Sequence, residues 1–199
     1  MRLAVAVALT LGLVVAPAHA AKRHTCKARG SETVRADEGG RVYTREHPRT
    51  GYETHYACSY RSGTHWDMNQ DDDNVTAITL ASPYVAFLRY NVDSHIASSD
   101  LYVLDMRTGR ERFLAEFRRE PDDPAGEDFG QAVLSRSGAV AWTTVRVGDG
   151  ATRLSKRDRD GRAVLDPGPG VDAGSLALSP SGRRLYWSNA GEPRTSRLR

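Results

Sequence analysis

The stretch that decides the fold is Ser175-Leu-Ala-Leu-Ser-Pro-Ser-Gly-Arg-Arg-Leu-Tyr-Trp-Ser188, near the end of the printed chain. Leu176 and Leu178 alternate with small residues, as a half-buried strand requires. Pro180-Ser181-Gly182 predicts a tight turn, because proline fixes φ and glycine accepts positive φ. Leu185-Tyr186-Trp187 then begins a second β-prone run. The stretch therefore predicts two antiparallel strands joined by a turn.

Weaker copies of this stretch recur upstream, and four copies can be aligned on the strand after the turn. The apolar residues at the aligned position are Val42, Val85, Val140 and Leu185. They recur at intervals of about 43 to 55 residues, the range expected for repeat architectures. Hairpin turns recur with a similar period at Ser62-Gly63, Arg107-Thr108-Gly109 and Asp160-Gly161. Two markers with one period predict a repeated structural unit.

Each unit offers four short strands, except the fourth, which offers three. In the second unit the expected strands are at about 76–81, 84–90, 99–105 and 110–115. In the fourth unit they are at about 175–178, 183–188 and 194–198. We therefore expect an all-β fold in which residues 32–199 form about four antiparallel four-stranded sheets, the last lacking a strand.

Two segments resemble the blade repeats of TolB-like and WD-type β-propellers, namely Leu178-Ser-Pro-Ser-Gly-Arg-Arg-Leu-Tyr-Trp187 and Leu101-Tyr-Val-Leu-Asp-Met-Arg-Thr-Gly109. The resemblance covers roughly residues 32–199 and lacks the Gly-His and Trp-Asp dipeptides of the WD type at their places. The resemblance implies a small or incomplete β-propeller and does not indicate any catalytic or binding residue. Lys22 to Arg29 could supply the missing strand and close the ring. Alternatively the array stays half open, or closes as a homodimer through its open blade edge.

The first twenty residues have the features of a signal peptide. Arg2 precedes the almost wholly apolar run Leu3 to Val15, and Ala18-His19-Ala20 is an A-x-A cleavage site. The alternative, a membrane anchor, would need a longer apolar run. We expect residues 1–20 to be removed, so that a secreted or periplasmic chain without a membrane span begins with an N-terminal segment, residues 21–31.

The chain has two cysteines, Cys26 and Cys58. In an exported protein they are expected to pair, closing a loop of about 33 residues and stabilising the fold by about 3–4 kcal/mol. Cys58 alternates with Tyr56 and Tyr60 in a predicted strand, so the three side chains share a face. If these tyrosines pack inward, Cys58 is buried and the bridge pins residue 26 over the core.

The formal net charge is +3, and almost all of the 28 basic residues are arginine. Arginine forks suit carboxylate and phosphate partners, but genomic base composition is the simpler explanation of the arginine excess. Basic residues gather near the end of the chain, at Arg183, Arg184, Arg194, Arg197 and Arg199. Such a cluster could bind polyanions, but a solvated surface is the simpler interpretation. The mild net charge does not indicate a nucleic-acid partner.

One loop has the oxygen spacing of a weak calcium site. Asp67, Asn69, Asp71 and Asp73 alternate along the chain, as calcium ligands often do. Asp72 stands where an EF-hand loop needs glycine and Ile78 where it needs glutamate, so a solvated polar loop is the simpler interpretation. No other cofactor is expected.

Histidines and aromatic residues have structural explanations. His55 and His65 flank one hairpin turn and could face each other, but no third zinc ligand is suitably spaced. Six aromatic residues are expected in the core between sheets: Tyr84, Phe87, Tyr90, Tyr102, Tyr186 and Trp187.

The sequence holds no nucleophile elbow, zinc-protease, phosphate-loop or dinucleotide motif. We therefore expect a non-catalytic binding or scaffolding protein with a protein or glycan partner. One alternative is a cell-envelope hydrolase or lyase in which His55, His65 and an acidic side chain converge in a pocket. Another is a calcium-assisted carbohydrate-binding module.

Overall fold

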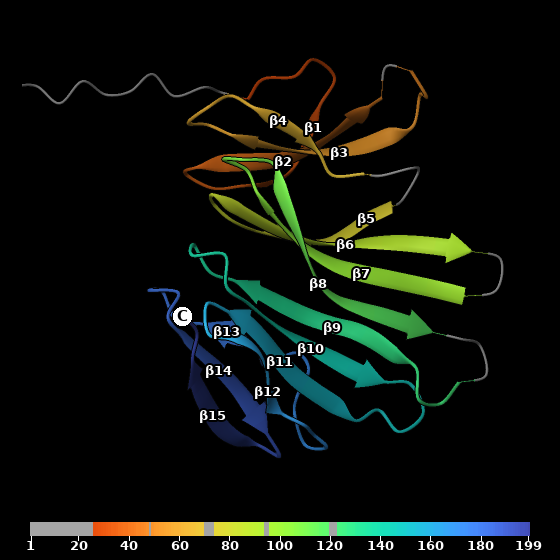
Figure 1. Cartoon of the computed structure of the whole chain (residues 1–199), viewed down its shortest axis with the longest axis vertical. Coiled ribbons are helices and arrows are strands. Elements are labelled where there is room, and N and C mark those ends of the chain that lie inside the picture. Colours follow the sequence, from red (N-terminus) through yellow and green to blue (C-terminus); the bar gives the residue numbers. More distant parts are fainter. Residues whose placement is uncertain (1–25, 48, 70–73, 94–95, 120–122) are drawn as a thin grey trace, which may run out of the picture.

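The computed structural model describes residues 26–47, 49–69, 74–93, 96–119 and 123–199. In these ranges the chain forms strands, turns and loops without a helix, so the predicted all-β fold is confirmed (Figure 1). The strands make four antiparallel sheets in chain order, the last with three strands as expected. In the described part no helix could cross a bilayer. The predicted signal peptide, residues 1–20, lies outside the described residues.

Sheets 1 and 2 each contain four strands paired in sequential order. Sheet 1 consists of β1 (Glu32–Ala36), β2 (Gly40–Glu46), β3 (Glu53–Ser59) and β4 (His65–Asp67). Sheet 2 consists of β5 (Asn74–Ala81), β6 (Tyr84–Asp93), β7 (Ile96–Asp105) and β8 (Arg110–Arg119). The four strands expected in sheet 2 are present but longer than predicted. Their hydrogen-bonded register continues beyond the apolar residues that mark a strand in the sequence.

Sheets 3 and 4 repeat the same plan, and sheet 4 stops after its third strand. Sheet 3 consists of β9 (Glu127–Leu134), β10 (Val140–Arg146), β11 (Thr152–Asp158) and β12 (Gly161–Asp166). Sheet 4 consists of β13 (Ala177–Leu178), β14 (Arg184–Asn189) and β15 (Glu192–Arg197). The three strands expected in the fourth unit are thus present, with ends shifted by up to two residues.

The sequence repeat corresponds to a structural repeat. The aligned residues Val42, Val85, Val140 and Leu185 are each fully buried at the start of the second strand of their sheet. The three predicted hairpin turns join the third and fourth strands of sheets 1, 2 and 3. The periodic positions are therefore those that hold the sheets together.

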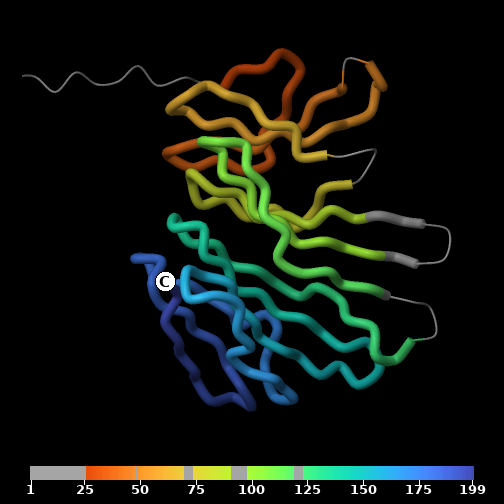
Figure 2. Tube along the Cα trace, viewed as in Figure 1, coloured from red at the N-terminus to blue at the C-terminus, as the bar shows by residue number. Residues whose placement is uncertain are grey.

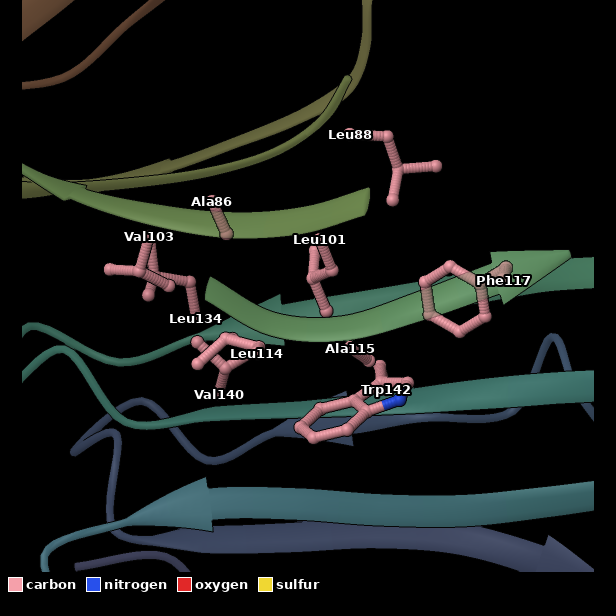
Figure 3. Close-up of a cluster of buried hydrophobic side chains, with 10 residues drawn as sticks. All are labelled: Ala86, Leu88, Leu101, Val103, Leu114, Ala115, Phe117, Leu134, Val140 and Trp142. Atoms are coloured by element: carbon pink, nitrogen blue, oxygen red, sulfur yellow. The ribbon is translucent and has the colours of Figure 1, made fainter. Parts of the chain in front are cut away.

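The sheets are stacked in chain order, from sheet 1 at the top of the view to sheet 4 at the bottom (Figures 1 and 2). Each interface is filled by apolar side chains. Val42 and Ala57 of sheet 1 meet Phe87 of sheet 2. Leu101 and Leu114 of sheet 2 meet Val140 and Trp142 of sheet 3 (Figure 3). Ala141 and Leu154 of sheet 3 meet Leu185 and Trp187 of sheet 4.

A buried ion pair connects sheet 2 with the end of sheet 1. The Arg89 guanidinium donates to both carboxylate oxygens of Glu111 at 2.6 and 2.7 Å, and its Nε donates to the carbonyl oxygen of Met68 at 2.9 Å. Arg89 is only 4% exposed and lies over the Tyr102 ring. Because loss of one partner would leave the other charge buried, this pair constrains how the two sheets meet.

Polar contacts also connect sheets 3 and 4. The buried Asp166 carboxylate accepts hydrogen bonds from Trp187 Nε1 at 2.9 Å and from Asn189 Nδ2 at 2.9 and 3.0 Å. Burial alone would raise the pKa of Asp166, but these hydrogen bonds and one from the Gly168 backbone lower it below its ordinary value. The indole of Trp187, in sheet 4, is therefore held by the Asp166 carboxylate of sheet 3.

The N-terminal segment covers the outer face of sheet 1. The expected disulfide between Cys26 and Cys58 is present, and both residues cluster with Tyr43 and Tyr56. Arg41 donates to the Cys26 carbonyl oxygen at 2.6 and 3.0 Å. Residues 26–29 therefore lie on sheet 1. They do not supply the missing strand of sheet 4, which the sequence analysis considered as a way to close the ring. Residues 22–25 lie outside the described part.

Gly109, in the β7–β8 turn, lies under the Trp66 ring of sheet 1. Trp66 Nε1 donates to the Met106 carbonyl oxygen at 2.9 Å, which holds the indole in place. Gly109 has a φ of +73°, and a Cβ there would overlap the indole. This contact needs glycine for both its conformation and its size.

We expect Gly109→Ala to destabilise the protein by about 2–5 kcal/mol, the sum of a left-handed backbone penalty and overpacking against Trp66. Gly150→Ala is the matched control, because Gly150 has a φ of +68° and an added methyl group there would have nothing within 4 Å. The control should lose only about 1–2 kcal/mol. Equal losses in urea denaturation would contradict the packing role of Gly109.

Loss of the disulfide should uncover sheet 1. We expect Cys58→Ala, or reduction of the native protein, to lower the free energy of unfolding by about 2–5 kcal/mol. The loss should appear first as faster hydrogen exchange in β2 and β3, since these strands lie beneath the N-terminal segment. Two free thiols per chain in the unfolded, unreduced protein would contradict the bridge itself.

Candidate functional site

A cleft lined by arginine and serine lies at the turn end of sheets 3 and 4. Its volume is about 930 Å³. It is lined by Ser135, Arg136, Ser137, Arg159, Ser179, Ser181, Gly182, Arg183, Arg184, Tyr186, Arg197, Leu198 and Arg199. No Asp or Glu side chain appears among these lining residues, all of which belong to the described part of the chain. We call this feature the arginine cleft.

Two copies of one turn motif form its serine-rich wall. In Ser135-Arg-Ser-Gly138, the Ser135 hydroxyl accepts the backbone N–H groups of residues 137 and 139, both at 3.2 Å. In Ser179-Pro-Ser-Gly182, the Ser179 hydroxyl likewise accepts the N–H groups of Arg183 and Arg184, at 3.3 and 3.1 Å. These hydroxyls are therefore used to shape the turns, which is the usual role of serine in such motifs.

Turns of this kind meet along one side of the whole array, at the left in Figure 1. The close approaches between successive sheets are Gly39 with Ser82, Tyr84 with Gly138, and Ser135 with Gly182. Ser82 also donates twice to Asp37, at 2.6 and 2.8 Å. The arginine cleft is the end of this row of turns, beside the C-terminus marked in the figure.

The last residues of the chain form the other wall of the cleft. Leu198 is 2% exposed and belongs to the core between sheets 3 and 4. The Arg199 backbone N–H donates to Asp158 Oδ2 at 3.0 Å, and Arg159 N–H donates to the Arg199 carbonyl oxygen at 3.2 Å. Because Leu198 and the Arg199 backbone are held in place, the side chains of Arg197 and Arg199 line the cleft.

Asp158 is the buried carboxylate behind this wall. Burial would raise the pKa of Asp158, but hydrogen bonds from Lys156 and from the backbone N–H groups of Arg199 and Asp160 lower it below its ordinary value. The Lys156 Nζ to Asp158 Oδ2 distance is 2.7 Å. Asp158 is thus satisfied by its own partners and does not neutralise the arginine side chains of the cleft.

The positive charge of the cleft is only partly balanced. Asp160 lies 3.2 Å from Arg199 and 3.7 Å from Arg159, and Arg136 pairs with the exposed Glu38 at 2.6 Å. In the described part of the chain, the guanidinium groups of Arg183, Arg184 and Arg197 make no ion pair or hydrogen bond. Three unpaired guanidinium groups in one cleft can bind carboxylate, sulfate or phosphate groups by donating forked hydrogen bonds to their oxygens.

A second cavity lies where the first strands of sheets 1, 2 and 3 come together. Its volume is about 420 Å³, and Arg35, His55, Thr76, Phe129 and Gln131 are among the lining residues. Burial lowers the pKa of His55. Nδ1 of His55 is buried and makes no hydrogen bond. No Asp or Glu side chain is among the described residues that line the cavity, and the Glu53 carboxylate, two residues along β3, partly offsets the lowering of the His55 pKa.

The two histidines do not face each other, and that expectation is wrong. His65 is paired with Cys58 in the β3–β4 register, and its Nδ1 lies 2.6 Å from the Tyr43 hydroxyl. His55 is three residues from Cys58 along β3 and therefore points to the opposite face. The register of the hairpin, which the sequence leaves open, decides this separation.

The proposed calcium loop is only partly described. Asp67 Oδ1 accepts the Asn69 N–H at 2.9 Å, and Asn69 Oδ1 accepts the His55 N–H at 2.8 Å. These two oxygens therefore stabilise the end of β4, while Asp71 and Asp73 lie outside the described residues. Within the described ranges no group of three or more metal-binding side chains is present. The calcium site stays a prediction.

Two of the six aromatic residues expected in the core are exposed. Phe87 and Trp187 are buried, and Tyr84 and Tyr102 are half-buried. Tyr90 and Tyr186 are 36% and 44% exposed. Tyr186 lies on the strand face opposite Leu185 and Trp187, and it is one of the residues that line the arginine cleft.

Part of the arginine cleft was visible in the sequence. The C-terminal basic cluster contains four of its arginines, whereas Arg194 of that cluster does not line the cleft. Arg136 and Arg159 were missed, because they come from turns that tertiary packing brings to the same place. The repeated Ser-x-Ser-Gly motif at 135–138 and 179–182 was the available signal for Arg136.

Comparison with protein-family models and with curated proteins finds no match to this chain.

We expect Asp158→Asn to loosen the wall of the cleft that carries Arg197 and Arg199. The pKa of Asp158 is lower in the folded than in the unfolded state, so its contribution is present above the ordinary aspartate pKa and is lost as pH falls through the folded value. The variant should be about 1–3 kcal/mol less stable at pH 7. The difference from the native protein should shrink below about pH 4.

Asp172→Asn, at an exposed position on the loop before β13, is the control for this measurement. Urea unfolding at a series of pH values checks the prediction. A loss of stability in Asp158→Asn that stays constant down to pH 2 would contradict it.

Proposed function

We propose that the protein is an exported, non-catalytic binding protein whose arginine cleft takes an acidic partner, either a protein or a glycan. The observation that carries this proposal is the set of three unpaired guanidinium groups of Arg183, Arg184 and Arg197 in one cleft. A rigid stack of sheets with ligands bound at its turns is a common arrangement of binding proteins.

The same proposal describes the four sheets as blades of an open, propeller-like array. The first strands β1, β5, β9 and β13 are neighbours in that order, as the inner strands of successive blades would be. In Figure 1 sheets 1 and 4 lie at opposite ends of the molecule, which supports a half-open arrangement. The disulfide is compatible with an extracellular or periplasmic location, which supports export.

The enzyme alternative has less support. It required His55, His65 and an acidic side chain in one pocket, whereas the two histidines lie on opposite faces of sheet 1. The open edge of β15, proposed above for a homodimer, carries Pro193 and Arg194. Proline lacks the N–H that strand pairing needs and charged edges repel one another, so this edge is poorly suited to self-association.

The test is binding of polyanions by the triple variant Arg183→Gln, Arg184→Gln, Arg197→Gln. At low salt we expect the native protein to bind polygalacturonate, heparin or polyglutamate, and the variant to bind about tenfold or more weakly. The control Arg29→Gln, Arg61→Gln, Arg110→Gln removes the same charge from exposed positions on sheets 1 and 2 and should bind within about twofold of native. Equal losses in both variants, or no binding by the native protein, would contradict the proposal.

A further inference from the structure

The outer face of sheet 4 is exposed along β14 and β15. In β14 the residues alternate, with Leu185 and Trp187 buried against sheet 3 and Arg184 and Tyr186 exposed. All but one residue of β15 are exposed. By contrast, residues 140–144 of β10 are buried in succession, because sheet 3 is covered on both faces.

On this outer face two arginines lie directly opposite each other. Arg184 of β14 pairs in register with Arg197 of β15, so the two side chains project from the same side of the sheet. Like charges at directly opposed positions destabilise a sheet. In the described residues neither guanidinium has an acidic partner, so a bound anion would relieve the repulsion.

Tyr186 lies next to this pair on the same face. Its register neighbours are Ala177 on β13 and Thr195 on β15, both exposed and both small. Tyr186 is 44% exposed, and neither neighbouring strand places a large side chain over its ring. A flat aromatic surface flanked by small residues can receive a second flat object.

We propose that this face binds the uronic-acid units of an acidic polysaccharide, a proposal that rests on the proposed function and specifies its ligand. The C–H groups of a pyranose ring would stack on Tyr186, since the ring face of tyrosine is electron-rich. Arg184 is two residues along the strand, roughly 7 Å away. At that distance Arg184 and Arg197 can together hold the carboxylate carried by the stacked sugar.

The alternatives account for fewer of these observations. An acidic peptide would use the arginines but would not need an open tyrosine ring beside them. A second copy of this chain docked symmetrically on the same face would bring two Arg184–Arg197 pairs together, which like-charge repulsion opposes. The combination of one open aromatic ring and one forked anion site therefore favours a charged sugar.

The experiment compares a uronic-acid trimer, trigalacturonate, with its methyl ester and with polyglutamate, by calorimetry at low salt. The native protein should bind the trimer at least about tenfold more tightly than the ester, which lacks the carboxylate charges. Tyr186→Ala should weaken trimer binding about tenfold and leave polyglutamate binding unchanged. Tyr186→Phe, which keeps the ring, should bind the trimer within about twofold of native.

Nuclear Overhauser effects between the Tyr186 ring protons and the sugar protons, present with the native protein and kept in Tyr186→Phe, give a readout that a purely structural role would not produce. If polyglutamate binds and Tyr186→Ala leaves trimer binding unchanged, the sugar proposal is wrong while the acidic-partner function stands. If a sulfated oligosaccharide binds in a Tyr186-dependent way and the uronate does not, the carboxylate assignment is wrong. If no polyanion binds, both proposals fail.

Discussion

The structure depends on one constraint: a single antiparallel sheet of this size cannot bury both of its faces, so each sheet is stable only against a neighbour. The burial of the second strand of each sheet shows how the sheets satisfy this constraint. β10, in the third layer, is buried on both faces. β14, in the last layer, alternates between buried and exposed. The residues at the aligned repeat position supply the contact in every sheet.

The two ends of the array meet this constraint differently. At sheet 1, the disulfide-bonded segment beginning at Cys26 covers Tyr43 and Tyr56 and acts as an additional layer. At sheet 4, the outer face is polar and charged instead of covered. The array thus has a capped apolar end and an open cationic end, and the ligand that we propose would bind at the open end without disturbing the core.

Buried polar contacts hold the layers in a defined relative position. The Arg89–Glu111 pair reaches the backbone after β4, and Asp166 receives the indole N–H of Trp187. Apolar contacts are non-directional, whereas each of these groups must find its own partner to avoid an unsatisfied buried charge. The turns that build the arginine cleft are therefore held at fixed positions, although they belong to different sheets.

The sequence by itself determined the all-β class, the repeated unit, the three-stranded last sheet and the disulfide, because these follow from local periodicity, turn residues and the cysteine count. It also indicated a basic cluster near the C-terminus. Only the tertiary structure decided that His55 and His65 lie on opposite faces, that residues 26–29 cover sheet 1, and that Arg136 and Arg159 join Arg184 and Arg197 in one cleft. The physical reason is that strand register and sheet stacking are set by contacts between residues far apart in the chain, which local patterns do not record.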